Sequence, residues 1–403
     1  MEKVKLNRHF ISDIFFYQEG PGVRKWQFKD SGVKLINVGN INNGKIDLSS
    51  TKINISEEEA YGKYSHFLID EGDLLIACSG IVVENFHNKI AFIKKEHLPL
   101  CLNTSTMRFK ELPEKKGDLN FLKYFLQTND FKSQLRKLIT GSAQLNFGPS
   151  HIRKIEIPLP NLATQQRIAA ILDQADAIIQ NNRAIVQKYD ALTQSLFLDM
   201  FGDPVKNEKG WEIRKMEEIS LKITDGTHQS PKFLKEGIPF LLVSNIVNNK
   251  INYKTNKFIS EEDFETLNKR TPIEIGNILL TSVGSYGNPA IIESQMKFAF
   301  QRHIAFIKPN HSMINYHFLF HFLKSDLIKR EIDKKVKGAA QKTYNLVELK
   351  KLRIILPTIT LQNQFAERVA VIEAQKQQAQ LELAKSEELF ASLLQRAFKG
   401  ELN

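Results

Sequence analysis

Residues 141–160 read GSAQLNFGPSHIRKIEIPLP, and residues 338–357 read GAAQKTYNLVELKKLRIILP. The two stretches match without a gap at an offset of 197 residues. Each begins with a turn of small residues that includes a glutamine and ends on a Leu-Pro pair. The same offset continues through Gln165 and Gln362 to Phe201 and Phe398. Such self-similarity indicates a chain built from two related halves.

The halves also match upstream, at a slightly different offset. Residues 55–58 and 259–262 both read ISEE, and GDLL at 72–75 corresponds to GNIL at 276–279. We therefore expect a globular block, a short segment, a second globular block and a second short segment.

Each short segment is predicted to be one long amphipathic helix that follows a proline. Neither segment has a glycine or proline between about residues 161 and 201 or 358 and 399. Apolar residues recur at alternating spacings of three and four, which is typical of a coiled-coil seam. The first predicted seam is Ile168, Ile171, Ala175, Ile178, Ile185, Tyr189, Leu192 and Leu196, interrupted by Asn182. The second is Phe365, Val369, Ile372, Ala379, Leu383, Phe390, Leu393 and Ala397, with Lys376 and Ser386 in line.

The ends of these helices carry the expected signals. Asn161 or Thr164, and Thr358 or Thr360, are candidate N-caps. Gly202 and Gly400 stand where a left-handed residue ends a helix most easily.

The two helices are expected to form an antiparallel pair, because one leaves the first block and the other leaves the second. About 35 helical residues at a rise of ~1.5 Å span ~50 Å, so the pair is expected to hold the blocks apart. The alternative is two separate helices, each packed on its own block. Four apolar residues beside the seams are expected to face a partner: Ile179, Val186, Phe197 and Leu394.

The globular blocks show mixed signals that predict an α+β fold. Residues 119–139 and 315–337 are each expected to form one helix. Short β-branched and aromatic runs predict strands at 33–38, 74–77, 91–93, 155–159, 238–243, 277–281, 305–307 and 352–356. The predicted architecture is two α/β domains separated by an antiparallel pair of long coiled-coil helices, with a pseudo-two-fold internal repeat. The expected domains are 1–160, 161–204, 205–357 and 358–403.

A net positive charge is found only in the two large blocks. Residues 1–160 carry 23 basic and 18 acidic residues, a net +5, and residues 202–360 carry 25 and 17, a net +8. Residues 161–201 and 361–403 are each at −1. This distribution favours a polyanionic partner for the blocks, although a charge that only keeps the domains soluble is the alternative.

Other features limit the class of protein. No run of about 18 apolar residues is present, so a cytoplasmic protein without a membrane partner is expected. Cys78 and Cys101 lack a CxxC spacing and are expected to be buried apolar residues rather than a metal site. Phosphate loops, HExxH, GxSxG and glycine-rich cofactor turns are missing, so no catalytic residue is expected.

Several motifs together resemble the specificity subunits of Type I restriction–modification enzymes. LFLDMFGDP at 196–204, followed by KGWE at 209–212, resembles the end of their central conserved helix. One common class of their target recognition domains is similar to DGTH at 225–228 with SP at 230–231, GIPF at 237–240 and VSN at 243–245. A different class is similar to EGPGVRKWQF at 19–28 with GVKLIN at 32–37.

The resemblance implies a division of labour. Each block would read one half of a bipartite site in double-stranded DNA, and the helices would set the gap and dock two modification (methyltransferase) subunits. Restriction subunits with translocase and nuclease activity would join this core. S-adenosylmethionine, ATP and magnesium would be bound by those partners, and no cofactor by this chain. Because the loops of the two blocks differ, we expect an asymmetric site; a stand-alone DNA-binding regulator is the alternative.

Loop residues are the candidates for DNA contact. The repeated turn lies between a helix and a strand in both halves, where glycine and small residues permit close approach to a nucleic-acid backbone; a folding role for this turn is the alternative. Trp26 and Tyr286 are equally consistent with packing. The candidates are Arg24, Lys25, Trp26, Ser79, Gly80, Ser142, Gln144, Thr224, Thr227, His228, Ser282, Ser285, Tyr286, Asn288, Gln341 and Lys342.

Overall fold

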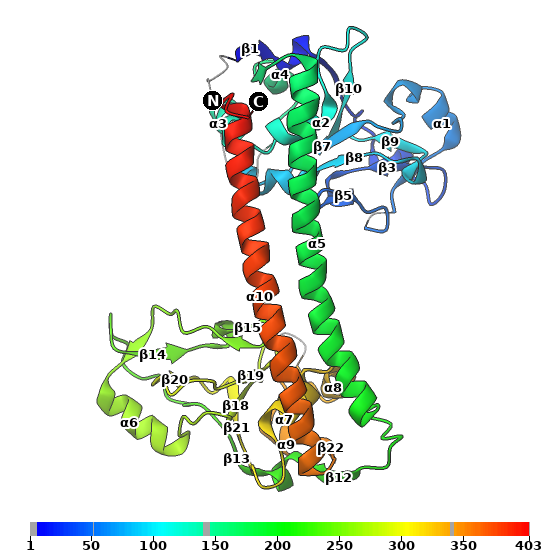
Figure 1. The fold of residues 1–403 in the computed structure, drawn as a ribbon. Helices are drawn as coiled ribbons and strands as arrows, with labels where there is room; N and C mark the ends of the chain where they lie inside the picture. The colour runs from blue at the N-terminus through cyan, green and yellow to red at the C-terminus, as the bar shows by residue number, and fades with distance from the viewer. Residues whose placement is uncertain (1–5, 51, 140–145, 339–341, 403) are drawn as a thin grey trace. The chain divides into compact units, whose positions relative to one another are not determined.

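The computed structural model describes residues 6–50, 52–139, 146–338 and 342–402, and the chain divides into two compact units (Figure 1). Unit 1 comprises Met1–Asn182 and Glu382–Asn403, and unit 2 comprises Arg183–Leu381. Each unit holds one globular block and one end of each long helix. The predicted α+β class with two related domains and two long helices is confirmed.

Unit 1 is built on a four-stranded antiparallel sheet in the order β2-β10-β7-β8. A smaller sheet has the order β6-β3-β9, in which β3 and β9 are parallel, and β1-β11 and β4-β5 are two-stranded. The strands are β1 (Asn7–Phe10), β2 (Phe15–Glu19), β3 (Val33–Ile36), β4 (Ile41–Asn42), β5 (Lys45–Ile46), β6 (Asn54–Ile55), β7 (Leu74–Ala77), β8 (Ile90–Phe92), β9 (Leu100–Leu102), β10 (Thr106–Glu111) and β11 (Glu156–Leu159).

Unit 2 repeats this topology strand for strand. Its sheets have the orders β13-β21-β18-β19, β17-β14-β20, β12-β22 and β15-β16. The strands are β12 (Glu212–Lys215), β13 (Ser220–Asp225), β14 (Ile238–Leu241), β15 (Ile246–Val247), β16 (Lys250–Ile251), β17 (Phe258–Ile259), β18 (Ile278–Thr281), β19 (Pro289–Ile291), β20 (Ala299–Phe300), β21 (Ile304–Pro309) and β22 (Arg353–Leu356).

Every predicted strand is present, within a few residues of its expected bounds. The two predicted block helices are wrong in one respect, because each is split in two. The N-caps Thr128 and Ser325, whose hydroxyls accept from Phe131 and Ile328 N–H, start a new helix at the split. The helices are α1 (Glu57–Tyr61), α2 (Leu119–Phe125), α3 (Asn129–Leu138), α4 (Pro149–Ile152), α5 (Leu162–Phe201), α6 (Glu261–Arg270), α7 (Tyr316–Lys324), α8 (Asp326–Asp333), α9 (Leu346–Lys350) and α10 (Ile359–Phe398).

The long helices α5 and α10 each run for 40 residues without a break. Asn161 caps α5 by accepting from Thr164 N–H (2.9 Å), and Thr358 caps α10 by accepting from Leu361 N–H (3.4 Å). Gly202 and Gly400 follow the two helices with φ of +77° and +74°, as predicted.

The predicted antiparallel pairing is confirmed within each unit. In unit 1 the beginning of α5 lies beside the end of α10, and Asn182 Nδ2 donates to Ser386 Oγ (2.8 Å). In unit 2 the end of α5 lies beside the beginning of α10, and the rings of Phe201 and Phe365 are 5.3 Å apart. The seam of α10 matches the prediction, with Phe365, Val369 and Ala397 buried.

The seam predicted for α5 is wrong at every second position, where the residue that faces α10 is the one that follows the predicted residue. Ile178, Ile185 and Leu192 are 51, 42 and 49% exposed. Leu172, Ile179, Val186 and Thr193 face the seam in their place and in place of Ile171, whereas Ile168, Ala175, Asn182 and Tyr189 face it as predicted. This true seam mixes apolar with polar side chains, so the more apolar neighbouring row was mistaken for it. Accordingly, the residues expected on outer faces are turned inward: Ile179 and Phe197 are buried, and Val186 and Leu394 are half-buried.

A buried glutamine fastens the start of α5 to the block of unit 1. Gln165 is fully buried, and its Nε2 donates to the carbonyls of Lys116 and Pro160 (both 2.9 Å). Its Oε1 accepts from Asp118 N–H (2.9 Å), at the N-cap of α2. One side chain therefore satisfies backbone groups of two loops that would otherwise be buried without partners.

Gln362 makes the same three contacts in unit 2. Its Nε2 donates to the carbonyls of Met313 (3.3 Å) and Pro357 (2.8 Å), and its Oε1 accepts from Asn315 N–H (2.8 Å). The repeated glutamine seen in the sequence is thus a repeated structural clamp.

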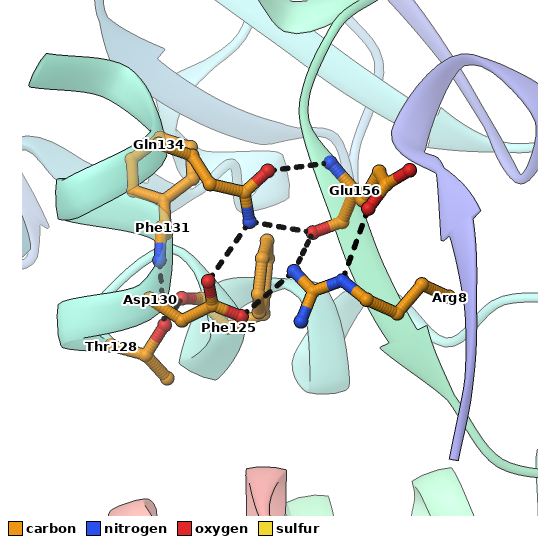
Figure 2. A network of polar contacts seen from close by, with 7 residues as sticks. All are labelled: Arg8, Phe125, Thr128, Asp130, Phe131, Gln134 and Glu156. Atoms are coloured by element: carbon orange, nitrogen blue, oxygen red, sulfur yellow. Dashed lines mark hydrogen bonds and ion pairs between the residues drawn. The ribbon is translucent and has the colours of Figure 1, made fainter. Parts of the chain in front are cut away.

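A second polar network ties the first strand of unit 1 to its neighbours (Figure 2). Arg8 of β1 donates from Nη2 to Asp130 Oδ2 (2.9 Å) and from Nε to Glu156 Oε2 (3.2 Å). Gln134 of α3 donates to the Glu156 carbonyl and accepts from the Glu156 N–H (both 2.9 Å). The network joins β1, α3 and β11, although its half-exposed ion pairs add only modest stability.

Both cysteines are buried, as predicted, and burial raises the pKa of Cys78 and of Cys101 to about 12. Their thiols therefore stay protonated at neutral pH.

In the described ranges, no group of three or more His, Cys, Asp or Glu side chains is arranged to hold a metal ion. Among these residues, no helix is both long and apolar enough to cross a bilayer.

We predict that Gln165→Leu lowers the stability of unit 1 by about 1–3 kcal/mol, because three partly buried backbone groups lose their partner. The exposed neighbour Gln166 is the matched control, and Gln166→Leu should change stability by less than about 0.5 kcal/mol. Thermal or urea unfolding of the full chain measures both. Equal effects of the two substitutions would contradict the clamp.

Candidate nucleic-acid interface

Two loops of unit 2 leave the same edge of its four-stranded sheet. Strands β13 and β18 both pair antiparallel with β21 and therefore run parallel to each other. In the register, Asp225 at the end of β13 and Leu280 near the end of β18 both lie opposite Ala305. The loops at 226–237 and 282–288 therefore start at one edge.

The segment that enters β21 passes between these loops. Arg302 N–H donates to the Thr227 carbonyl (3.0 Å), and Ser282 N–H donates to the His303 carbonyl (2.9 Å). Gly226 makes the crossing possible, since a Cβ there would lie 2.1 Å from the Phe300 carbonyl oxygen. Arg302 is exposed at this edge.

Thr227 and His228 of the first loop and Thr224 of β13, all predicted residues, lie next to a buried carboxylate. Asp225 Oδ2 is 2.8 Å from His228 Nε2, and Asp225 Oδ1 accepts from Arg270 Nη2 (2.7 Å). The same guanidinium nitrogen donates to Thr224 Oγ1 (3.3 Å), while Thr227 Oγ1 donates to the Gln229 carbonyl (2.8 Å). Thr224 and His228 are thus held in one cluster that also contains Arg270.

Most of the predicted residues of the second loop make contacts that hold the loop in its conformation. Ser282 is only 8% exposed, Asn288 Nδ2 donates to the Ser285 carbonyl (2.7 Å), and Tyr286 Oη donates to Asp333 Oδ1 (2.8 Å). These side chains shape the loop, and Tyr286 also packs against the core of unit 2. Ser285 is exposed at the tip.

Lys342 joins this loop from the repeated turn. Gly284 N–H donates to the Lys342 carbonyl (3.0 Å), and Tyr344 N–H donates to the Ser282 carbonyl (2.8 Å). The Lys342 side chain is exposed beside the loop. Gln341, the other predicted residue of this turn, lies outside the described residues.

Unit 1 forms a corresponding edge from the matching strands. Gly20 N–H donates to the Thr106 carbonyl and Cys78 N–H to the Ser105 carbonyl, so the loops after β2 and β7 flank the start of β10. Asn146 Oδ1 accepts from Ser79 Oγ (2.9 Å) and from Gly80 N–H (2.8 Å). This bond ties the Ser79–Gly80 loop to the segment that follows the repeated turn. The predicted Ser142 and Gln144 lie outside the described residues.

Arg24, Lys25 and Trp26 form a separate exposed group in unit 1. Their loop leaves the same sheet edge but is held to α1, because Gln27 Nε2 donates to Glu59 Oε1 (2.7 Å) and to Tyr64 Oη (3.1 Å). Trp26 is 78% exposed, which removes the packing interpretation of this residue. An indole held outward by an anchored loop can make apolar contact with the edge of a base pair in a groove, such as a thymine methyl group.

Sequence reasoning missed Arg270 and Arg302. The ISEE motif that begins α1 and α6 is shared by both halves, but α6 has 10 residues where α1 has 5. The five additional residues of α6 end at Arg270. The difference between the two halves after the ISEE motif was the sequence signal that pointed to this residue. Arg302 follows a short strand, β20, that was not predicted.

The family described as the Type I restriction modification DNA specificity domain matches this chain twice, over residues 4–188 and 208–383. The chain is 24% identical over 353 residues to the MjaIX specificity subunit of Methanocaldococcus jannaschii, covering 83% of this chain and 80% of the relative. It is 23% identical to the EcoKI specificity subunit of Escherichia coli over 402 residues, covering 93 and 83%. The fold is similar to that of the Type-I restriction-modification system S subunit from M. genitalium, with a TM-score of 0.55, 16% identity and coverage of 98% of this chain and 96% of that one.

A duplicated α/β domain with two long helices, two related loop-bearing edges and an excess of positive charge defines a class of two-domain DNA-recognition proteins. Within that class, this chain belongs to the Type I restriction modification DNA specificity family, whose domain it contains twice.

We predict that Trp26→Ala weakens binding to the cognate duplex by roughly fivefold to a hundredfold, because an apolar contact with a base edge is lost. The unfolding temperature should stay unchanged, since the ring is exposed. Tyr61, at the end of α1 and 57% exposed, provides the control Tyr61→Ala, for which little loss is expected. Titration of labelled duplex at fixed salt measures the affinity; equal affinities of the wild type and Trp26→Ala would refute the contact.

Proposed function

We propose that this chain is the DNA-recognition subunit of a Type I restriction–modification complex, and that each unit reads one half of an asymmetric bipartite sequence in double-stranded DNA. The observation that carries the proposal is the loop-bearing sheet edge, which is built twice from matching strands but presents different side chains. The matching strands position the two edges in the same way, whereas loops of different sequence select different bases.

The charge of the two blocks supports this function. A net +5 and +8 supply phosphate affinity that does not depend on sequence. Exposed loop residues such as Trp26, Arg270 and Lys342 then add contacts whose geometry can depend on the bases. The division between positioning and reading is the one found in protein–DNA interfaces generally.

The long helices are proposed to set the gap between the half-sites and to dock two modification subunits. An exposed apolar row of Ile178, Ile185 and Leu192 follows a seven-residue spacing along α5, beside the seam already used by α10. Such a row suits a further helix from a partner. The helical segments carry a net −1 each, which disfavours DNA and favours protein as the ligand of this face.

The chemistry is proposed to belong to the partner subunits. Modification subunits would bind S-adenosylmethionine, and restriction subunits would use ATP and magnesium. In this proposal the chain contributes recognition and no catalytic group. The specificity subunits to which it is similar are named as parts of restriction enzymes, which does not favour a stand-alone DNA-binding regulator.

Exchange of residues 206–350 for the second domain of another family member tests the recognition proposal. One half of the recognised sequence should change, and the other half and the gap should be retained. Mapping methylated sites after co-expression with the modification subunits measures all three. A change in both halves would refute the modular assignment.

We predict that the double variant Ile185→Asp/Leu192→Asp reduces assembly with the modification subunits at least tenfold, because two charges replace a desolvated apolar contact. The control Gln187→Asp/Gln194→Asp adds the same charges at exposed positions of the same helix and should assemble normally. Analytical ultracentrifugation measures assembly, and circular dichroism checks that both variants stay helical. Normal assembly of the first variant would exclude this row as the docking face.

A further inference from the structure

We propose that Arg270 determines specificity by contacting a guanine in the half-site read by unit 2, and that Asp225 is the positioning residue that aims its guanidinium. This inference rests on the proposed function and adds a residue and a base to it. The base edge in question is the O6 and N7 side of guanine in the major groove.

The geometry combines a buried acceptor with an exposed donor. The Asp225 side chain is 12% exposed, whereas that of Arg270 is 49% exposed. Arg270 Nη2 donates to Asp225 Oδ1 (2.7 Å) and to Thr224 Oγ1 (3.3 Å). Two acceptors on strand β13 therefore fix the outer end of a side chain that begins at the end of α6.

Both contacts use the same guanidinium nitrogen, Nη2, and the Arg270 side chain as a whole is 49% exposed. Guanidinium carries five N–H donors in one plane, and guanine presents two acceptors in the major groove that a pair of them can reach. A guanidinium already held by a carboxylate loses less rotamer freedom when it makes this contact. Orientation of this kind matters for a directional base contact and much less for a phosphate contact.

A buried carboxylate at a DNA-binding edge has a second effect. It offsets the charge of Arg270 and so weakens the attraction of this residue for phosphates, while it preserves the hydrogen-bonding donors. The other oxygen, Asp225 Oδ2, is occupied by His228 Nε2 at 2.8 Å. The two oxygens of the Asp225 carboxylate therefore contact two exposed side chains, those of Arg270 and His228.

The pair lies at the predicted DNA-binding edge of unit 2. Asp225 is the last residue of β13, and Thr227, two residues on, accepts from the N–H of the exposed Arg302. Arg270 therefore stands beside the loop at 226–237 and the segment that enters β21.

Unit 1 has no counterpart of the pair within its described residues. Glu19 ends β2 as Asp225 ends β13, and each is followed by a glycine that packs against a neighbouring backbone. Glu19 accepts from the Cys78 thiol (3.9 Å), and burial raises the pKa of Glu19. Helix α1 ends at Tyr61 and contains no residue that corresponds to Arg270. A guanine contact of this type is therefore expected in one half-site.

The competing explanation is that Asp225 and Arg270 only brace α6 against β13. A brace and a base contact differ in what their loss changes. Loss of a brace lowers the melting temperature and leaves base preferences alone. Loss of a base contact changes the preference at one position of the second half-site.

The test uses the chain assembled with its modification subunits and a duplex library randomised across the recognised sequence. Wild type should select guanine at a position of the second half-site that Arg270→Ala then relaxes by roughly 10- to 100-fold. The first half-site should stay unchanged. Arg270→Gln, which keeps an exposed polar side chain, should relax the same position.

Asp225→Asn tests the positioning role. It should weaken the guanine preference at that position while binding to unrelated duplex becomes tighter, because one negative charge is lost. Lys269, the exposed neighbour on α6, is the control, and Lys269→Ala should leave every base preference intact.

The outcomes separate this inference from the function on which it rests. If wild type selects a bipartite sequence but no guanine in the second half-site, or if both Arg270 variants retain every preference, only the inference is overturned. A uniform loss at all positions would make Arg270 a phosphate contact and would also overturn it. If wild type selects no bipartite sequence, the proposed function fails as well.

Discussion

The buried glutamine at the start of each long helix is the contact on which the rest of the molecule depends. A helix that leaves a domain must begin where the chain still has unpaired backbone groups, and at this junction they are shut off from water. Gln165 and Gln362 supply one acceptor and two donors to these groups. The direction in which each helix leaves its block is thereby fixed by three hydrogen bonds from one residue, and the neighbouring strands and loops are fixed with it.

The repeat explains why so much of the fold could be predicted from one sequence. Both halves have the same fold, so equivalent strands such as β7 and β18 were predicted from two separate stretches of sequence. The repeat gave no such help where both halves carry the same misleading pattern, as at residues 119–139 and 315–337. Residues 119–139 were expected to form one helix because their apolar face continues across Thr128, and the capping bond that divides them has little effect on that pattern.

The register of α5 shows the same limit. Hydrophobicity favoured the row of Ile178, Ile185 and Leu192, but the seam uses Ile179, Val186 and Thr193 at these steps, and the Thr193 hydroxyl finds a partner in the Tyr189 carbonyl. The matching positions of α10 would have identified the correct row, since Phe365 and Val369 correspond to Ile168 and Leu172. The candidate site was harder to predict, because it depends on which loops meet at a sheet edge. Arg270 reaches that edge through a five-residue difference in helix length that no periodicity reveals.

Polar contacts in the seam restrict how the helix pair can change. Asn182 is matched to Ser386, and Lys376 Nζ lies 2.7 Å from Asp190 Oδ1. A change of one helix by a single turn would move each of these groups against an apolar neighbour, whereas equal insertions of seven residues in both helices would restore the pattern. Length can therefore vary only in coupled steps of two turns, or about 10 Å of helix. That is close to a third of a turn of duplex DNA, so any such step would also rotate one recognition surface around the double helix.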